Sequence, residues 1–225
     1  MFDFEPIDHR IQKHIIAFLM ENKVARFRDM RPPKTDTNLY SYHLKILLKQ
    51  GYVTKTDEGY VLGTKGAVYV DRVSSATVKL RPQPKIITML VIQNDEGDVL
   101  MFRKKRQPFI GLWTLPYGKV HNDDLSVYDA ANREIEEKLG GMKVPNLKHV
   151  GDTYVHVTNE NEVAMSTMIH IFYGTTNDEP TLDALHWVRP LKITDEESAP
   201  GVFEVVQFGL ISKQYFFEEV TTSWR

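Results

Sequence analysis

The sequence predicts an α+β protein of two domains, and three observations support this prediction. The chain has 225 residues, of which 42% are hydrophobic, which is enough apolar material for two cores of ordinary size. Helical spacing dominates the first 50 residues, and alternating strands and helices follow. Prolines interrupt the pattern at residues 76–84, where we place a linker. We therefore expect one domain at residues 1–75 and another at residues 85–225.

Composition excludes several classes of protein. The chain has no cysteine, so disulfides and thiolate chemistry are absent. Its first residues lack the basic and apolar regions of a signal peptide, and no apolar run is long enough to span a membrane. These features are typical of a soluble protein, and we expect a cytoplasmic location without a membrane partner.

Charge is divided unevenly along the chain. Residues 1–80 have 13 Lys and Arg against 9 Asp and Glu, whereas residues 81–225 have 15 against 21. Binding to double-stranded DNA depends strongly on neutralising its phosphates. The basic first part therefore favours a nucleic-acid partner.

Three helices are expected before the first strand. Asp8 is a candidate N-cap for a first helix, which carries isoleucine and leucine at helical spacing and ends before Asn22. A short second helix is expected around Ala25–Met30, before two prolines. A third is expected at Thr37–Lys49, followed by Gly51.

A hairpin is expected after these helices. Residues 52–55 and 60–62 alternate on either side of a Thr-Asp-Glu-Gly turn. Three helices and a hairpin are the order of a winged helix-turn-helix, whose second motif helix lies in the major groove. Residues 38–53, with the run Tyr-His-Leu-Lys-Ile-Leu, resemble the pattern of bacterial and archaeal winged-helix regulators. A protein-interaction or dimerisation module is the alternative.

Side chains that suit DNA occur on the third helix and around it. The helix offers amide, hydroxyl, imidazole and ammonium groups to bases or phosphates, from Asn38, Ser41, Tyr42, His43, Lys45 and Lys49. The preceding turn and the hairpin offer cations to phosphates, from Arg31, Lys34, Lys55 and Lys65. His43 considered alone favours a structural role.

Strands and helices alternate after the linker. Apolar strands are expected at residues 86–93 and 99–104, joined by the turn Asn-Asp-Glu-Gly. One helix is expected at residues 125–139 and a last one at residues 202–219. Further strands are expected at residues 153–157, 165–173 and 184–188.

A loop and the helix after it form a recognisable motif. The loop reads Gly-Leu-Trp-Thr-Leu-Pro-Tyr-Gly-Lys-Val over residues 111–120, and the helix reads Arg-Glu-Ile-Glu-Glu-Lys-Leu-Gly over residues 133–140. Together they resemble the Nudix box, and the resemblance extends over about residues 85–210. It implies an α/β/α sandwich that binds a divalent metal ion and a nucleoside-diphosphate-linked substrate, which water attacks at phosphorus.

One metal ligand is missing from this helix. Carboxylates at positions i, i+3 and i+4 share a face and converge on one ion, and Mg²⁺ needs such oxygen ligands. Glu134 and Glu137 occupy the first two positions, but Lys138 occupies the third. We expect its ammonium group to weaken metal binding and to pair with Glu134. Arg133 keeps its place and is expected to orient Glu137.

The loop departs from the family pattern in two further ways. Asp124 falls on the first acidic position, but one extra residue separates it from Arg133. Tyr117 replaces the usual glycine, and its ring either narrows the pocket or stacks on a base.

Trp113 and Leu115 are expected in the core. The residues that we expect to bind the ligand are Arg103, Tyr117, Gly118, Lys119 and Lys138.

The remaining polar residues carry weaker expectations. Family hydrolases take a further acidic residue from a later loop, and Glu160 and Glu162 are the nearest candidates. The histidines of this part show no metal-ligand spacing and are expected to be structural or exposed: His121, His149, His156, His170 and His186.

Two functions fit these features. The first is a homodimeric, DNA-binding transcriptional regulator whose Nudix domain senses a nucleotide, nucleotide-sugar or sugar-phosphate metabolite. It is similar to known Nudix-related regulators, although most carry the Nudix domain first. The second is an active Mg²⁺-dependent diphosphohydrolase, with Glu134, Glu137 and Arg133 catalytic and the two glutamates as metal ligands. Lys138 favours the sensor, and a scaffold without either activity is a third hypothesis.

Overall fold

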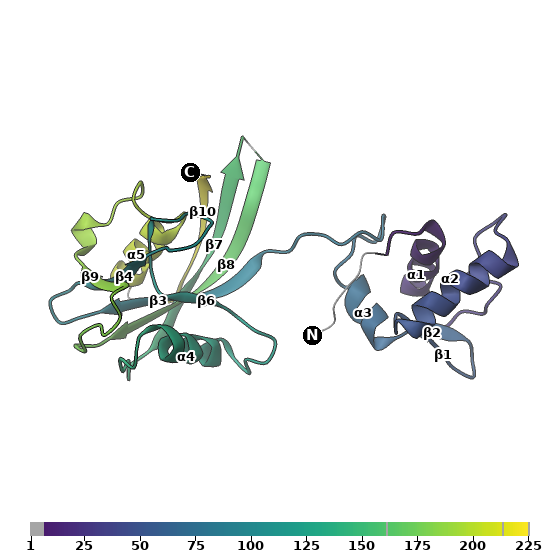
Figure 1. Ribbon diagram of the computed structural model, residues 1–225, viewed down its shortest axis with the longest axis horizontal. Coiled ribbons are helices and arrows are strands. Elements are labelled where there is room, and N and C mark those ends of the chain that lie inside the picture. Colours follow the sequence, from purple (N-terminus) through teal and green to yellow (C-terminus); the bar gives the residue numbers. More distant parts are fainter. Residues whose placement is uncertain (1–6, 161, 213, 225) are drawn as a thin grey trace. The chain divides into compact units, whose positions relative to one another are not determined.

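The computed structural model describes residues 7–160, 162–212 and 214–224. They form two compact units, one ending at Pro82 and the other beginning at Gln83 (Figure 1). Each unit has a hydrophobic core of its own. Of the helices in the described ranges, none combines the length and apolar character that a membrane span needs.

The first unit consists of helices and one small sheet. Its elements are α1 (Arg10–Glu21), α2 (Thr37–Lys49), β1 (Val53–Lys55), β2 (Tyr60–Leu62) and α3 (Thr64–Val70). β1 and β2 pair antiparallel, as the hairpin prediction requires. Ile11, Ile15 and Leu19 lie on the buried face of α1 and pack into the same core as Leu44 and Leu47 of α2.

Two expectations for the first unit are wrong. The short helix around Ala25–Met30 is replaced by hydrogen-bonded turns, in which Asp29 donates to Arg26 O. Ala25 exchanges two backbone hydrogen bonds with Tyr60 of β2, and this pairing holds the chain extended where the helix was expected. The third helix of the unit is instead α3, after the hairpin, which is too short to show a clear helical period.

The N-cap of α1 is also corrected. His9, not Asp8, precedes the helix, and its ring accepts a hydrogen bond from Ile11 N. Asp8 pairs instead with Lys13 at 3.6 Å. In α2, Asp36 is the N-cap and accepts from two backbone amides of the first turn. This cap explains why α2 begins at Thr37.

The segment after α3 belongs to the first unit. Val73 pairs with Leu80 in an isolated bridge, and the hydroxyl of buried Tyr69 donates to Val78 O. The unit therefore continues to Pro82, beyond residue 75, where we placed the end of the first domain.

The second unit is built on a mixed eight-stranded sheet. The strands are β3 (Lys85–Gln93), β4 (Val99–Arg103), β5 (Trp113–Thr114), β6 (Tyr117–Lys119), β7 (Lys148–Asn159), β8 (Glu162–Thr175), β9 (Leu185–Val188) and β10 (Phe216–Ser223). The main order is β10-β7-β8-β3-β4-β5, while β6 pairs with β3 and β9 pairs with β4. The β3–β8 and β7–β10 pairs are parallel, and the other pairs are antiparallel.

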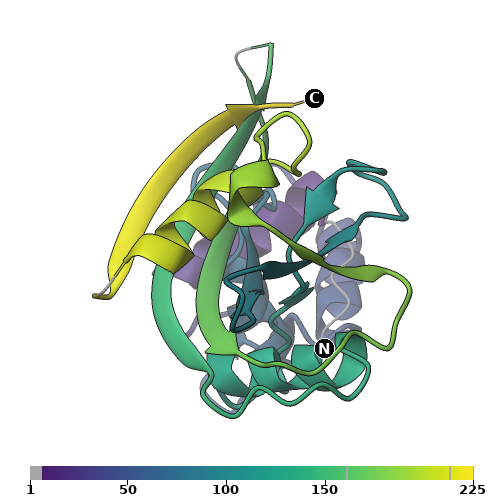
Figure 2. The same cartoon turned by 90° about the vertical axis from the view of Figure 1, so that its left-hand side faces the viewer.

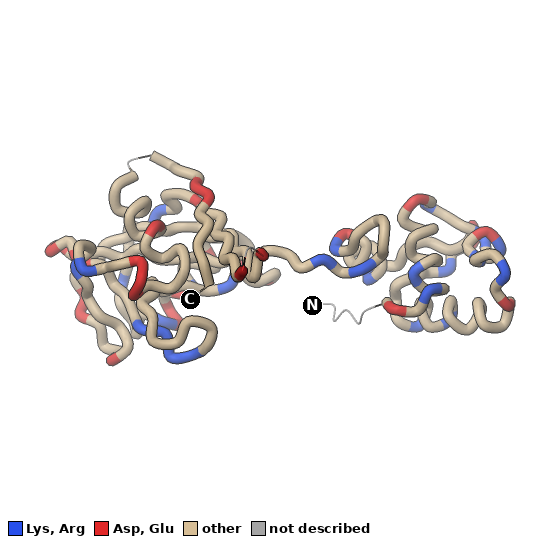
Figure 3. Tube along the Cα trace, turned by 90° about the horizontal axis from the view of Figure 1, so that it is seen from above, with Lys and Arg blue, Asp and Glu red and all other residues tan. Residues whose placement is uncertain are grey.

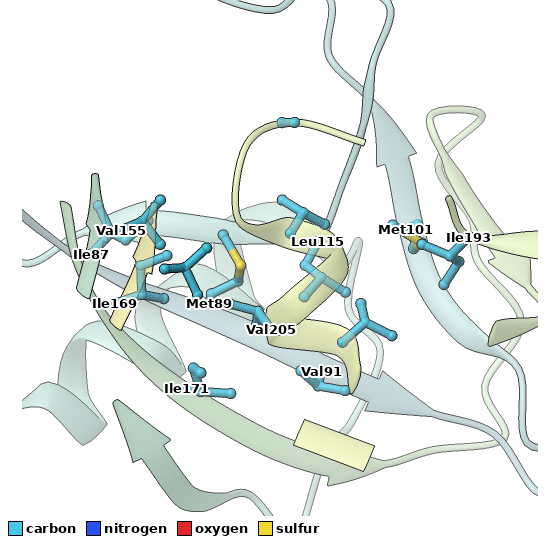
Figure 4. Packing of buried hydrophobic residues seen from close by; sticks show 14 of the residues in the cluster. Ile87, Met89, Val91, Met101, Leu115, Val155, Ile169, Ile171, Ile193 and Val205 are labelled. Atoms are coloured by element: carbon cyan, nitrogen blue, oxygen red, sulfur yellow. The ribbon is translucent and has the colours of Figure 1, made fainter. Parts of the chain in front are cut away.

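Helices cover both faces of this sheet. Alternate residues of β3 point in opposite directions, so Met89 and Val91 pack in one core cluster with α5 (Val202–Ile211), including Val205 (Figure 4). Leu90 and Ile92 pack in another cluster with α4 (Val127–Lys138). Figure 2 shows the two helices on either side of the curved sheet. A 3₁₀ turn, η1 (Pro190–Lys192), follows β9.

The end of the chain differs from the prediction of one long helix over residues 202–219. α5 ends at Ile211, and Ser212 is already extended. Phe216–Ser223 then forms β10 and pairs in parallel with β7. The run is rich in aromatic and β-branched residues, which favour strands, and β7 offers an edge for it to pair with.

Candidate functional site

A cavity of about 640 Å³ lies on the α4 side of the second unit. It is bordered by the end of β4, the loop after it, β6, α4 and residues 182–185. Among the described residues, its charged lining has two glutamates, Glu134 and Glu137, against seven cations. The cations are Arg103, Lys104, Lys105, Arg106, Lys119, Arg133 and Lys138. An excess of positive charge in a concave site suits an anionic ligand.

Lys138 is paired inside this cavity. One turn of α4 separates it from Glu134, and its Nζ lies 2.6 Å from Glu134 Oε2. The same ammonium group donates to Tyr117 O and lies 5.1 Å from the centre of the Tyr117 ring. The expected pair between Lys138 and Glu134 is confirmed, and it ties α4 to β6.

Glu134 is held by a second cation and by close packing. Arg133 Nη1 donates to Glu134 Oε1 at 2.6 Å, and the Glu134 side chain is only 4% exposed. The carboxyl group packs against Gly118, where a Cβ atom would lie 1.7 Å from Glu134 Cδ. Gly118 is thus glycine because the carboxylate occupies the space of a side chain.

These carboxylates do not fit a Mg²⁺ ion. Both oxygens of Glu134 are bound by cations, at 2.6 Å each. The side chain of Glu137 is 57% exposed, and its nearest cation is Arg133 at 3.9 Å. Mg²⁺ needs oxygen ligands that are free to bind it, and the ammonium of Lys138 stands beside the one buried carboxylate. The expected pair of Arg133 with Glu137 is present, but at 3.9 Å it is longer than the contacts of Arg133 with Glu134 and Asp124.

Arg133 has a stronger partner that the sequence reasoning did not assign. Its Nε and Nη2 donate to the two oxygens of Asp124 at 3.0 and 2.8 Å, and Nη2 also donates to Lys119 O. His121 N donates to Asp124 as well, at 2.7 Å. The turn at residues 121–124 accommodates the inserted residue, so Asp124 reaches Arg133 despite the irregular spacing. Its acidic position in the motif was the available signal.

The Asp124–Arg133 pair predicts a specific pH dependence. Hydrogen bonds from Arg133, and then from His121 N, lower the pKa of Asp124 from 3.8 to about 2. A carboxyl group whose pKa is lower in the folded than in the unfolded protein stabilises the fold at pH values above its unfolded-state pKa. This contribution disappears as the pH falls through its folded-state pKa. Denaturant unfolding of the wild type and of Asp124→Asn should thus differ by a constant amount above about pH 4 and converge toward pH 2. A difference that does not depend on pH would contradict the role of this ionised pair.

The other ligand candidates occupy different positions around the cavity. Arg103 Nη1 donates to Gly111 O at 2.8 Å, and its guanidinium lies 4.4 Å from the Trp113 ring centre, so part of it is already engaged. Lys104, which was not predicted, donates to the Tyr117 hydroxyl at 2.8 Å. The ring of Tyr117 is nearly parallel to that of Phe102, with centroids 6.4 Å apart.

Residues expected elsewhere are also placed by the structure. Leu115 is fully buried and Trp113 packs against the same core, as predicted. Glu160 and Glu162 lie at the turn between β7 and β8. Neither belongs to the described lining of the cavity.

The α2 surface of the first unit carries most of the predicted nucleic-acid contacts. Lys34 and Lys55 beside it are exposed too, and basic positions recur throughout this unit (Figure 3). Arg31 donates to Thr37 at 2.7 Å, and Lys65 lies 4.8 Å from the Tyr52 ring centre. Ser41 is half-buried. Of the contacts predicted on α2, those at Asn38, Tyr42, Lys45 and Lys49 are exposed.

His43 does not belong to that surface. It is 8% exposed and stacks on His9, with ring centroids 3.6 Å apart. Burial, and then the neighbouring His9, lower the pKa of His43. On the helix, His43 falls on the buried side with Tyr40, Leu44 and Leu47. It is a core residue, and the expectation of a base or phosphate contact is wrong.

The class of the second unit follows from its architecture. Helices cover both faces of its sheet, and a loop and the helix α4 border a cavity beside the sheet. The sequence matches a family model described as "NUDIX domain" over residues 83–207. The chain therefore belongs to the NUDIX family. No curated protein matches the sequence.

The chain is similar to several solved structures. The mutator MutT protein from Bacillus halodurans has 20% identity and a TM-score of 0.51, over 61% of this chain and 89% of that chain. The MutT NUDIX hydrolase from Burkholderia pseudomallei has 24% identity and a TM-score of 0.48, over 56% and 98%. The NUDIX domain of Shewanella oneidensis NrtR, in complex with ADP ribose, has 15% identity and a TM-score of 0.46, over 63% and 94%. The first of these likenesses shows the fold.

Proposed function

We propose that this chain is a DNA-binding transcriptional regulator, in which the NUDIX domain senses a phosphorylated, nucleotide-derived metabolite without a catalytic metal ion. The observation that carries the proposal is the ion pair of Lys138 with Glu134, inside a cavity lined mainly by cations. A family hydrolase uses such carboxylates to hold metal. In this chain the lysine neutralises Glu134, and Lys105, Arg106 and Lys119 of the lining can meet a ligand.

The lining of the cavity indicates the class of ligand. Lys105, Arg106 and Lys119 suit phosphate groups, which lysine binds as a point charge and arginine binds through paired hydrogen bonds. Tyr117 and Phe102 add an aromatic wall on which a base can stack. Nucleotides, nucleotide sugars and sugar phosphates combine these two requirements to different degrees.

The first unit supports the DNA-binding half of the proposal. We assign it as a winged helix-turn-helix in which α2 is the recognition helix and the β1–β2 hairpin is the wing. Asn38 and Lys45 are exposed on α2 and suit base or phosphate contacts. Lys55, at the end of β1, suits a phosphate contact from the wing.

Regulation also requires coupling between the two units. A ligand changes DNA affinity only if it binds two arrangements of the protein with different affinity. We propose a homodimer, in which the ligand alters the spacing of two recognition helices.

The DNA-binding half is tested by selecting genomic fragments with the full-length protein and measuring affinity across a salt series. Lys45→Ala should weaken binding and reduce the slope of log affinity against log salt by about 1, because one phosphate contact is lost. Asn38→Ala should weaken binding and relax sequence preference. Lys79→Ala removes an exposed lysine outside α2 and the hairpin and should leave the slope unchanged. Failure to detect salt-dependent DNA binding would contradict the regulator proposal.

The sensing half is tested with ADP-ribose, NADH and nucleotide sugars, in the absence of divalent metal. At least one compound should bind and change the affinity for the selected DNA, and Lys119→Ala should weaken its binding. Incubation of the protein with the same compounds and Mg²⁺ or Mn²⁺ tests the alternative function, which is hydrolysis. Robust hydrolysis that is lost in Glu137→Gln would support the metal-dependent diphosphohydrolase instead.

A further inference from the structure

A second cluster of ligand-type side chains lies on two neighbouring strands of the second unit. His149 and Asp152 are on β7, and His170 is on β8. Asp152 Oδ1 is 2.8 Å from His149 Nε2 and 2.7 Å from His170 Nδ1. One ligand atom from each residue lies within 4.8 Å of the others. None of the three lines the cationic cavity.

A β-bulge brings these residues together. His149 and Asp152 are three positions apart, so a regular strand would point them to opposite faces. The register between β7 and β8 shifts between His149 and Gly151, however, so one extra residue lies in β7. Asp152 is then directly opposite His170 in the antiparallel pair. Bulges often redirect a side chain in this way, and the sequence spacing alone conceals the cluster.

Surrounding aromatic residues hold the cluster in place. The His149 ring stacks on Phe172 with centroids 5.0 Å apart, and Tyr128 of α4 accepts a hydrogen bond from His149 N. The hydroxyl of Tyr215, just before β10, donates to Asp152 Oδ2. The side chains of His149, Asp152 and His170 are each only about a fifth exposed. The imidazoles and the carboxylate are therefore positioned by β7, β8, α4 and the segment before β10.

The hydrogen bonds within the cluster shift the pKa values of its members. Burial by itself raises the pKa of Asp152, but hydrogen bonds from Tyr215, His170 and His149 outweigh it and lower the pKa below its ordinary value. The hydrogen bond to Asp152 raises the pKa of Tyr215 to about 12.

We propose that His149, Asp152 and His170 bind a divalent transition-metal ion, with Zn²⁺ as the representative species. Two imidazoles and one carboxylate are a ligand set that suits zinc, iron and nickel and leaves coordination positions open. Ligand atoms around a tetrahedral zinc ion lie about 3.3 Å apart, given bond lengths of about 2.0 Å. The nitrogen–oxygen distances in the cluster are roughly half an ångström shorter than this, so small side-chain rotations open it to an ion.

This site differs from the NUDIX helix in its ligand chemistry, and an ion bound to it would act on another part of the sheet. Its nitrogen donors select transition metals, whereas the carboxylates of Glu134 and Glu137 belong to the chemistry of Mg²⁺. A bound ion would also link β7 to β8 directly, and Tyr215 would join the segment before β10 through its hydrogen bond to the carboxylate. The ion is therefore expected to stabilise the outer part of the sheet.

The test is a Zn²⁺ titration of the full-length, tag-free protein after treatment with a chelator. We expect one Zn²⁺ per chain by calorimetry, a Co²⁺ absorption spectrum typical of nitrogen and oxygen ligands, and a higher melting temperature in Zn²⁺. His170→Ala and Asp152→Asn should abolish all three. His156→Ala is the matched control, because His156 lies on β7 with His149 and Asp152 but contacts Ser166. Its Zn²⁺ titration should match that of the wild type.

Further variants distinguish a metal site from a purely hydrogen-bonded cluster and from metal binding on α4. Tyr215→Phe should keep the stoichiometry and weaken Zn²⁺ binding by roughly 10- to 100-fold, as expected when a hydrogen bond to a metal ligand is lost. Glu137→Gln should have no effect on Zn²⁺ binding. The proposal is overturned if the wild type binds no stoichiometric Zn²⁺, or if binding survives in folded His170→Ala protein. Either result would mean that the three side chains form a hydrogen-bonded network only.

Discussion

Lys138→Glu should create a Mg²⁺ site on α4 that the natural side chains do not offer. The change removes the ammonium group that lies 2.6 Å from Glu134. It also supplies the missing carboxylate at i+4, so that three carboxylates share one face of the helix. We expect Mg²⁺ or Mn²⁺ affinity to rise on the order of a hundredfold, which corresponds to about 2.7 kcal/mol.

The expected gain in metal-binding free energy is smaller than the Coulomb energy of two unit charges, because solvent screens Lys138. Two unit charges 4 Å apart interact by about 4 kcal/mol at an effective dielectric constant of 20. The Lys138 side chain is 38% exposed, and solvent screening reduces such terms. Calorimetric titration with Mg²⁺ measures the change. Lys138→Gln removes the charge without adding a ligand and should give a smaller gain.

Hydrolysis is the second measurement on the same variant. If the rest of the NUDIX site is intact, Lys138→Glu should also gain Mg²⁺-dependent turnover of ADP-ribose or a nucleotide sugar. Metal affinity that stays unchanged in Lys138→Glu would show that Lys138 is not what keeps metal away from α4. The argument for a metal-free sensor would then lose its main support.

Gly118→Ala should destabilise the second unit. A Cβ atom at this position would meet Glu134 Cδ at 1.7 Å, so the carboxylate must leave its pocket. Overpacking and disruption of the pairs with Arg133 and Lys138 together should cost about 3 kcal/mol. Urea unfolding should show a lower midpoint with an unchanged slope.

A double variant tests the cause of this loss. Glu134→Ala removes the group with which the new methyl collides. If the clash is the cause, adding Gly118→Ala to Glu134→Ala should cost far less than adding it to the wild type, as a double-mutant cycle measures. Equal costs in both backgrounds would point to the backbone of β6 instead.

Local patterns predicted most of the secondary structure. The apolar runs of β3 and β4 began and ended within one residue of the expected positions, and the helix expected at residues 125–139 is α4, at Val127–Lys138. β10 was mistaken for the end of a helix because its pairing partner, β7, lies far earlier in the chain, with Gly151 opposite Phe216. The pairing itself leaves no local signal over such a separation, although the aromatic and β-branched residues of the run favour a strand.

The candidate site divides in the same way. An i, i+4 relation is a property of any helix, so the pair between Lys138 and Glu134 was predictable from the sequence. The contact of Lys138 with Tyr117 and the packing of Glu134 on Gly118 join β6 to α4, and they depend on how the two elements meet. His43 was misplaced although it lies at helical spacing with Tyr40, Leu44 and Leu47, which share the buried side of α2.

The sequence by itself determined the NUDIX motif, the lysine at its missing ligand position, and α1, α2 and the hairpin of the first unit. Tertiary structure alone decided that Asp124 binds Arg133 and that a bulge aligns His149 and Asp152 with His170. The physical reason is the range of the interactions. Helical spacing and side-chain charge act within a few residues, whereas strand register and close packing are set by segments that meet only when the chain has folded.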